Sequence, residues 1–255
     1  MQTAALLTRA VCVTAFMAAG SASHAERLVQ SSTEMRTYIY LQVAENKLEQ
    51  ILPKEWALNP GTKLLQGANV ALVFIEGLAA TDADNKPIPF HDSYVVVGVL
   101  AKHAQSGVST FMVVDGLVPP SQATPGPYGA YTTAKVAMSK QVEAKDGQSN
   151  RREAWSFTTD SGERLSFSTE YQLGIGTKSH MEPRVYSGIR PDFYRIYKAD
   201  LTSDTVHSIT PEGKKATSVS FSASGPRLGR LFDGSEKIIG VVAVPAYQRA
   251  IYLPD

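Results

Sequence analysis

The sequence predicts a mostly β protein of the α+β class with a few short helices, and three observations support this prediction. Apolar and β-branched residues come in short runs, broken by Gly, Pro, Asn and Asp about every ten to fifteen residues. Several runs alternate apolar and polar residues, as a half-buried strand does. The 255 residues are 43% hydrophobic and 19% charged, which is typical of a chain that buries a core and excludes a disordered one.

The first elements form a strand followed by a short helix. Residues 37–43 alternate Thr, Ile, Leu and Val on one side with Tyr, Tyr and Gln on the other, which predicts a half-buried strand. Residues 44–52 then carry Leu and Ile at helical spacing, and Pro53 ends this helix.

The remaining elements are predicted to be strands of one domain that covers residues 26–255. Residues 70–75 and 94–100 are apolar on both faces, so we expect these strands to be covered on both sides. The polar tetrapeptide at 159–162 ends in Gly between two alternating runs and predicts a hairpin. Further strands are expected at 111–114, 136–142, 154–158, 165–171, 193–199, 218–223, 237–244 and 247–252.

Residues 1–25 have the features of a secretory signal peptide. Arg9 precedes an apolar run at 10–20, and Ser23-His24-Ala25 offers a small-x-small cleavage site. The run is too short to span a bilayer, and no later run is longer. A buried N-terminal helix is the alternative. We therefore expect a periplasmic or secreted protein, and because Cys12 is the one cysteine, the mature chain would have no disulfide and no thiolate chemistry.

Composition and motifs exclude several classes of function. Lys and Arg number 25 against 24 Asp and Glu, with no basic block, so nucleic acid is not an expected partner. The mature histidines are scattered, so we expect no metal site, and no cofactor is implied. No serine lies in a Gly-x-Ser-x-Gly motif, and Gly174-Ile175-Gly176 lacks the third glycine of a dinucleotide-binding loop.

Two carboxylates and one lysine are candidates for chemistry. Glu76 shares a strand face with apolar residues, where a carboxylate needs a partner or a raised pKa unless the strand reaches solvent at Gly77. Asp92 precedes a buried strand, as a turn former or a cavity group. Lys135 follows the loop at 126–134 and is either solvated or a desolvated amine able to form a Schiff base.

A group of polar and aromatic side chains is the candidate for substrate binding. Arg36, Tyr38 and Tyr40 share one face of the first strand, which either faces water or lines a pocket. Tyr131 lies in the loop before Lys135 and joins this group.

The order of features along most of the mature chain resembles the acetoacetate decarboxylase family. Arg36-Thr37-Tyr38 and the helix end at 48–58 are similar to that family's N-terminal strand, helix and turn. The segments 190–194, 225–232 and 247–253 resemble its later segments. This resemblance implies a double-layered, cone-like β-barrel in which a lysine forms a Schiff base with a β-keto acid, beside an arginine and two glutamates.

Carried over by position, Arg36 resembles the family's arginine, Asp92 falls near one glutamate and Glu76 near the other. The family's paired lysines correspond to Ala134-Lys135, so either Ala134 or Lys135 occupies the nucleophile position and the pair itself is not kept.

Three hypotheses follow from the sequence. The first is a secreted Schiff-base lyase or aldolase-type enzyme that acts on a small keto acid or aldehyde through Lys135, with Asp92 or Glu76 moving protons. The second is a barrel that binds a small molecule without transforming it. The third is a structural envelope protein. The first two imply a small-molecule partner, no hypothesis includes a membrane span, and a homo-oligomer is left open.

Overall fold

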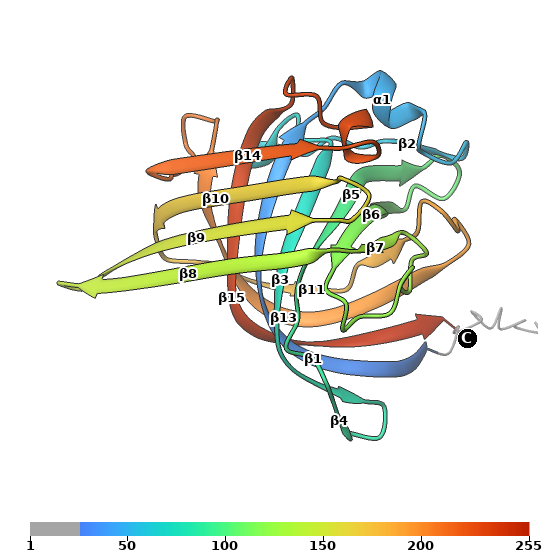
Figure 1. The fold of residues 1–255 in the computed structure, drawn as a ribbon, viewed down its shortest axis with the longest axis horizontal. Coiled ribbons are helices and arrows are strands. Elements are labelled where there is room, and N and C mark those ends of the chain that lie inside the picture. Colours follow the sequence, from blue (N-terminus) through green and yellow to red (C-terminus); the bar gives the residue numbers. More distant parts are fainter. Residues whose placement is uncertain (1–25, 255) are drawn as a thin grey trace, which may run out of the picture.

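The computed structural model describes residues 26–254, which form two β-sheets with little helix (Figure 1). The predicted mostly β class is confirmed. The predicted signal peptide, which contains Arg9 and Cys12, lies outside the described residues. The helical segments are α1 (Glu45–Glu49), η1 (Lys63–Leu65) and η2 (Leu228–Arg230).

The larger sheet, sheet A, has eleven strands, eight of which follow the order β11-β13-β15-β1-β3-β5-β6-β7. Its remaining strands pair with members of this path, β12 with β13, β2 with β5 and β4 with β3. The bounds are β1 Glu26–Gln42, β2 Trp56–Leu58, β3 Val70–Asp82, β4 Pro87–Ile88, β5 Ser93–His103, β6 Ser109–Val118, β7 Tyr131–Thr133, β11 Thr177–Met181, β12 Arg184–Tyr186, β13 Tyr194–Ser208 and β15 Lys237–Pro254.

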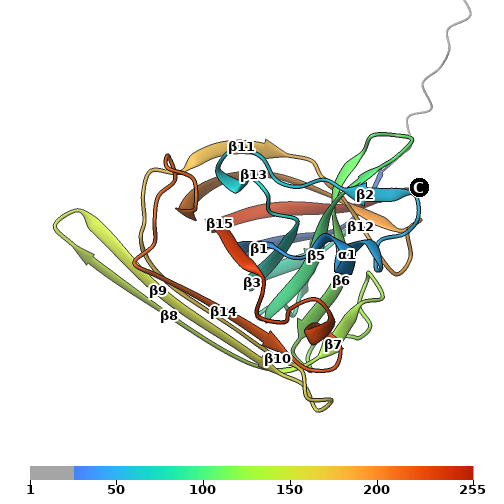
Figure 2. The same ribbon diagram turned by 90° about the horizontal axis from the view of Figure 1, so that it is seen from above.

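Sheet A curls until its two sides meet, as the view from above shows (Figure 2). The contact joins β6 to the segment after β12, where Val113 forms a bridge with Ser187 and the Gly188 amide donates to the Val113 carbonyl at 2.8 Å. The Thr110 hydroxyl also donates to the Arg184 carbonyl at 2.8 Å. The curled sheet therefore has an inner face shielded from solvent.

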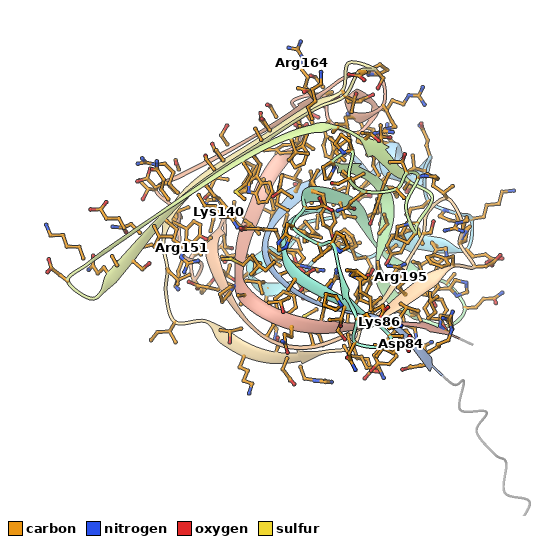
Figure 3. The ribbon with its side chains drawn as sticks, turned by 60° about the horizontal axis from the view of Figure 1, so that its bottom comes forward. Asp84, Lys86, Lys140, Arg151, Arg164 and Arg195 are labelled. Carbon is orange, nitrogen blue, oxygen red and sulfur yellow. The ribbon has the colours of Figure 1, made fainter. Side chains whose placement is uncertain are left out.

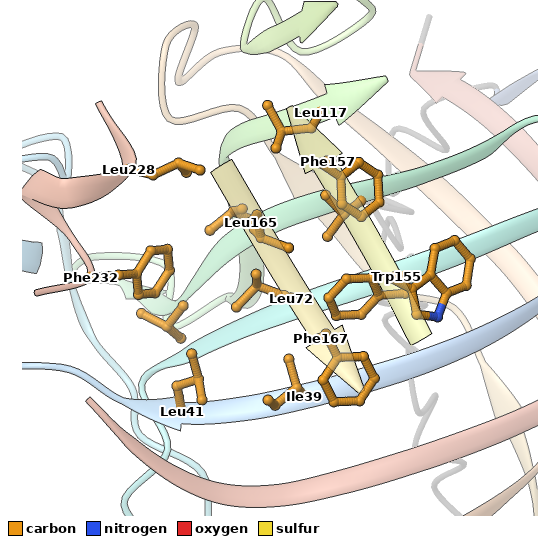
Figure 4. Close-up of a cluster of buried hydrophobic side chains, with 14 of the residues drawn as sticks. Ile39, Leu41, Leu72, Leu117, Trp155, Phe157, Leu165, Phe167, Leu228 and Phe232 are labelled. Atoms are coloured by element: carbon orange, nitrogen blue, oxygen red, sulfur yellow. The ribbon is translucent and has the colours of Figure 1, made fainter. Parts of the chain in front are cut away.

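The smaller sheet, sheet B, covers part of the outer face of sheet A. Its order is β14-β10-β9-β8, with bounds β8 Lys135–Lys145, β9 Gln148–Thr158, β10 Arg164–Gln172 and β14 Ser218–Ser224. Buried aromatic residues fill the space between the layers (Figure 4). The Phe74 ring lies 4.7 Å from the Phe167 ring and 5.5 Å from the Trp155 ring, centroid to centroid. Burial of these large rings holds the two layers together.

The longest strands extend well beyond the sequence prediction. The sequence predicts two strands, at 237–244 and 247–252, but β15 is one strand that continues through Pro245. The β1–β15 pairing shifts register between Glu34 and Arg36, which forms a bulge at this position. Such a bulge tolerates a proline, which has no amide to donate to the ladder. α1 is shorter than the predicted helix at 44–52, although Leu48 is fully buried as its spacing implied.

Two tight hairpins organise sheet B. The predicted hairpin at 159–162 joins β9 to β10 and is confirmed. A second one, which the sequence analysis did not identify, joins β8 to β9 through Asp146 and Gly147, both with positive φ. Two positive φ values at the central positions are typical of the type I′ turn, which an Asp-Gly pair favours. The β8–β9 hairpin projects from the body of the molecule (Figures 1 and 2).

Within residues 26–254, none of the helices is long and apolar enough to cross a membrane. The same range has no group of three or more His, Cys, Asp and Glu side chains arranged to hold a metal ion.

Candidate ligand chamber

A cavity of about 210 Å³, called the chamber below, lies against the inner face of sheet A. Its lining combines tyrosines and aliphatic side chains with two arginines. It is lined by Arg36, Tyr38, Tyr40, Ala71, Val73, Ile75, Tyr94, Val96, Leu100, Phe111, Val113, Tyr128, Tyr131, Met181, Pro183, Val185, Tyr197, Ala199, Tyr247 and Arg249.

Strand alternation determines which side chains reach the chamber. On β3, Ala71, Val73 and Ile75 line it, whereas the residues between them pack on sheet B. Successive side chains of a strand point to opposite faces of the sheet, so a strand between two buried layers is apolar on both faces. The prediction that residues 70–75 are covered on both sides is therefore confirmed.

The charged part of the chamber consists of two arginines that share one glutamate. Glu34 is fully buried on β1; its Oε1 accepts from Arg36 Nε, and its Oε2 lies 2.9 Å from Arg249 Nη2. The Tyr247 hydroxyl also donates to Glu34 Oε1 at 2.7 Å. Two guanidinium groups and one carboxylate leave an excess of one positive charge, and the arginine side chains are only 12% and 8% exposed.

The pKa shifts of this cluster keep all three groups charged. Burial alone would raise the pKa of Glu34, but Arg249 and Arg36 outweigh burial and lower it. Burial opposes the charged form of Arg36 and Arg249 as well, but Glu34 raises the pKa of both above its usual range. A charged cluster in an apolar wall stays stable only through such pairing.

Each arginine also has capacity for a further acceptor. Arg36 Nη1 donates to the Tyr38 hydroxyl at 2.8 Å, and Arg249 Nε donates to Ser32 Oγ at 3.1 Å. Together with Glu34, these partners occupy two nitrogens of each guanidinium. Among the described residues, Nη2 of Arg36 and Nη1 of Arg249 have no hydrogen-bond partner. A guanidinium has five N–H donors, so both arginines can still bind an anion.

The tyrosines provide neutral hydroxyl groups in an otherwise apolar wall. The hydroxyls of Tyr128 and Tyr197 are 2.6 Å apart. Burial raises the pKa of Tyr94 to about 12 and also raises the pKa of Tyr128 and Tyr131. These hydroxyls therefore remain protonated near neutral pH and serve as hydrogen-bond donors.

The Tyr131 ring depends on a glycine for its position. A Cβ atom at Gly116 would lie 2.5 Å from the ring, so a side chain at Gly116 would displace Tyr131. β7, which carries Tyr131, pairs with β6 in parallel opposite this glycine.

The structure brings the predicted substrate-binding residues together. Arg36, Tyr38, Tyr40 and Tyr131 all line the chamber, although they come from two distant parts of the chain. Of the two alternatives for the first-strand face that carries Arg36, the structure shows the pocket wall and not the wet surface.

The structure does not bring Lys135 to the chamber, which corrects its expected role as a buried amine. Its side chain is 83% exposed, and its nearest carboxylate is the exposed Asp160 at 3.9 Å. Consecutive residues of an extended chain alternate in direction. Ala134 is buried in the core between the sheets, so Lys135 points to solvent. No lysine lines the chamber in the part of the chain that the structure describes.

The two candidate carboxylates also lie outside the chamber lining. Glu76 faces sheet B and accepts from Lys140 Nζ at 2.6 Å, which supplies the partner that its position requires. Asp92 accepts a hydrogen bond from the Ser121 hydroxyl, and its backbone carbonyl accepts from the Gly77 amide. Asp92 therefore holds a loop against β5, in the manner of a turn former.

Glu34, Tyr247 and Arg249 were not identified from the sequence. The sequence contained a signal for Tyr247 and Arg249. Tyr247, Arg249 and Ile251 are two residues apart, so they share one face of a strand, and the neighbours of Arg249 on that face are aromatic or apolar. An arginine flanked in this way indicates a buried, paired charge. Glu34 offered no comparable signal, because it lies in a polar stretch that shows no strand periodicity.

Comparisons with known proteins concern the fold. No family model and no curated protein sequence matches the chain. Among solved structures, the enduracididine biosynthesis enzyme MppR, in complex with the condensation product of pyruvate and imidazole 4-carboxaldehyde, matches with a TM-score of 0.53 at 11% identity, over 92% of this chain and 90% of its own. An acetoacetate decarboxylase-like enzyme from Sphingomonas wittichii RW1 also matches with a TM-score of 0.53, at 9% identity over 96% of this chain and 98% of its own. Acetoacetate decarboxylase from Legionella pneumophila matches with a TM-score of 0.49, at 13% identity over 89% and 86%.

At such low identity, the matches to MppR and to the Sphingomonas enzyme are evidence for the fold alone. Residues 26–254 thus have the acetoacetate-decarboxylase-like fold, a curled sheet with a second sheet layered on its outside.

Proposed function

We propose that this protein binds a small monocarboxylate with an apolar body in the chamber, and that it does so without forming a Schiff base. The observation that carries the proposal is the excess positive charge of Arg36 and Arg249 over Glu34 inside a wall of tyrosine and aliphatic side chains. A carboxylate would neutralise that excess and fill the remaining guanidinium donors. The apolar body would contact Val73, Ile75 and the tyrosine rings.

The absence of a lysine from the chamber lining argues against amine catalysis at this site. A Schiff base needs a primary amine within reach of a bound carbonyl. Lys135 is exposed beside Asp160, and Lys140 is engaged with Glu76 on the outer side of sheet A. The chamber residues can position, neutralise and hydrogen-bond a ligand.

Titration with matched ligands tests the proposal. We expect benzoate to bind, as measured by isothermal titration calorimetry, and benzamide, of nearly the same shape but uncharged, to bind at least about tenfold more weakly. A hydrogen bond between charged groups contributes roughly 1.5–3 kcal/mol, which supports a difference of that size. Equal affinities for the two ligands would contradict the electrostatic argument.

Borohydride trapping tests the proposal that the ligand binds without forming a Schiff base. Incubation with pyruvate and sodium borohydride should leave the intact mass unchanged, because no amine of the described residues reaches the chamber. A reduced adduct that maps to a lysine, and that benzoate prevents, would overturn the proposal in favour of a Schiff-base enzyme.

We also propose export to the periplasm or the cell exterior, on the basis of the apolar run at 10–20 and the Ser23-His24-Ala25 site. N-terminal sequencing of the protein recovered from a periplasmic fraction should begin at Glu26.

A further inference from the structure

We propose that two copies of this chain associate through the open edge of β8, so that the two four-stranded sheets become one continuous antiparallel sheet. The chamber is not involved, so this inference is independent of the proposed ligand. It rests on the edge itself, on the charge pattern along it and on a groove at one of its ends.

β8 is a long edge strand that has neither a bulge nor a proline to prevent pairing. It pairs with β9 over all eleven residues, and among residues 26–254 no strand pairs with its other side. The register of the β8–β9 pair has no shift, and the strand contains no proline. Natural edges are commonly protected by bulges, prolines or an inward-pointing lysine. Lys140 does point inward, but Glu76 neutralises it at 2.6 Å (Lys140 is labelled in Figure 3).

The turn geometry shows which backbone groups the edge presents. Lys145 and Gln148 flank the two-residue turn and form its closing pair, which is hydrogen-bonded in this type of hairpin. Odd-numbered residues of β8 therefore bond to β9, and even-numbered residues direct their N–H and C=O groups to the open side. Among the described residues, no hydrogen bond reaches the even-numbered residues from that side.

One antiparallel register of two β8 strands is complementary in both charge and apolar surface. With Ser139 on the two-fold axis, Lys135 lies opposite Glu143 of the second copy, and Val136 lies opposite its Val142. Val142 is 62% exposed in the single chain, which is unusual for a valine on a strand and would be reduced by this contact. The register also places even-numbered residues opposite one another, as the open N–H and C=O groups require.

Neighbouring registers of the two β8 strands are less complementary in charge. With Lys140 on the axis, the two Lys140 side chains oppose each other and Lys135 opposes Lys145, so like charges meet in both pairs. With Met138 on the axis, Lys135 opposes Gln141 and Glu143 opposes Thr133, so no pair of opposite charges forms. The Ser139 register is thus the one that the sequence of β8 favours.

A groove at the beginning of β8 provides space for the other end of the partner strand. It has a volume of about 510 Å³ and lies between the loop at 120–125, the beginning of β8 and the turn at 158–161. In the Ser139 register, Lys145 of the second copy lies opposite Thr133, which lines this groove together with Asp160. The projecting hairpin tip of each copy would thus enter the groove of the other, beside an acidic side chain.

Charge reversal tests the interface. We expect the full chain to sediment as a dimer in analytical ultracentrifugation, and K135E or E143K alone to raise the dimer dissociation constant by about tenfold or more, because two symmetry-related pairs become repulsive. The double variant K135E/E143K restores opposite charges and should recover the dimer. K102E, which reverses an exposed lysine on β5, is the matched control and should have no effect. A monomeric wild-type chain, or a dimer that none of these changes affects, would overturn the proposal.

Cysteine crosslinking tests the register. In a full chain that carries Cys12→Ser, S139C should oxidise to a covalent dimer, because non-hydrogen-bonded partners lie about 4.5 Å apart between Cα atoms, within disulfide range. A137C and Q141C alone should not crosslink, since each residue lies about 14 Å from its own copy, four residues at about 3.4 Å each. A mixture of A137C and Q141C chains should crosslink. Efficient crosslinking of A137C alone, or none with S139C, would contradict the register. Benzoate affinity should be the same in all these variants, which separates this test from that of the chamber.

Discussion

At the scale of single residues, Glu34 allows two arginines to share one apolar chamber. It accepts from Arg36 and from the Tyr247 hydroxyl through Oε1 and pairs with Arg249 through Oε2. Without it, two buried guanidinium groups would face each other with no compensating charge. The same carboxylate leaves the chamber with one positive charge, which suits a single carboxylate ligand.

Replacement of Glu34 by glutamine should therefore destabilise the fold strongly. Removing one partner of a buried ion pair costs about 3–5 kcal/mol, because the remaining charge stays desolvated. Urea unfolding of E34Q against the wild type measures this loss. Glu49 is exposed on α1, and E49Q should change the unfolding free energy by less than about 0.5 kcal/mol. A cost for E34Q as small as that of E49Q would show that the pairing does not stabilise the fold.

Asp115 should make stability depend on pH. Burial raises its pKa to about 6, although Arg227, at 2.7 Å from Oδ2, acts in the opposite direction. In the folded protein Asp115 thus holds its proton up to about pH 6, whereas in the unfolded chain it loses it near pH 4. Between these values the folded state binds more protons, so this group lowers stability as pH rises, by roughly 2–3 kcal/mol in total.

D115N isolates this contribution because asparagine does not titrate. The unfolding free energy of D115N minus that of the wild type should become more positive from pH 4 to pH 7, whatever constant offset the lost contact with Arg227 introduces. Urea unfolding at several pH values measures the difference. A difference that is flat across this range would contradict the raised pKa.

The candidate site was predictable from the sequence only where it follows strand alternation. Arg36, Tyr38 and Tyr40 are two residues apart, so they had to share a face, whichever way that face points. Lys135 shows the limit of this reasoning. Its direction depends on whether its neighbour Ala134 packs into the core, and that core is built from strands throughout the chain.

At the scale of elements, β3 belongs to both interiors of the molecule. Its even-numbered residues Val70, Leu72 and Phe74 pack on sheet B, and its odd-numbered residues line the chamber. This double role explains why the run is apolar on both faces. Substitutions on β3 can therefore alter the contact between sheets A and B without altering the chamber, or the reverse.

F74A should loosen sheet B from sheet A and leave the ligand site intact. Phe74 is fully buried against the rings of Trp155, Phe157 and Phe167, and truncation of such a residue costs about 3–5 kcal/mol. F74L, which retains more of the volume, should cost less. Urea unfolding gives the two values, and calorimetry should give unchanged benzoate affinity under folding conditions. A large loss of affinity in F74L would show that the two faces of β3 are not independent.

The strands were predictable where periodicity was strong, as at 37–43 and 165–171. The polar first part of β1, residues 26–36, and the short strands β2, β4, β7 and β12 were not. Each of these is a strand because another strand accepts its hydrogen bonds, as the first part of β1 pairs with β15. Local composition carries little information about such pairing.

At the scale of the whole molecule, the chamber exists because the first and last described strands, β1 and β15, lie side by side. β1 and β15 pair along nearly their whole length, which places Ser32 opposite Arg249 and Glu34 opposite Tyr247. The charged cluster is thus assembled across more than 200 residues of sequence, as the Tyr247–Glu34 separation of 213 residues shows. A local sequence motif cannot record a site whose residues are this far apart in the chain.

Ligand binding in a chamber lined by both β1 and β15 should stabilise the entire fold. A ligand that binds only the folded state adds about 2.7 kcal/mol at a concentration one hundred times its dissociation constant. Thermal unfolding of the wild type should therefore shift to higher temperature with benzoate and much less with benzamide. R249M should unfold at the same temperature with and without benzoate at that concentration, because the variant chamber has no excess positive charge. A shift with benzoate as large in R249M as in the wild type would place the binding site elsewhere on the molecule.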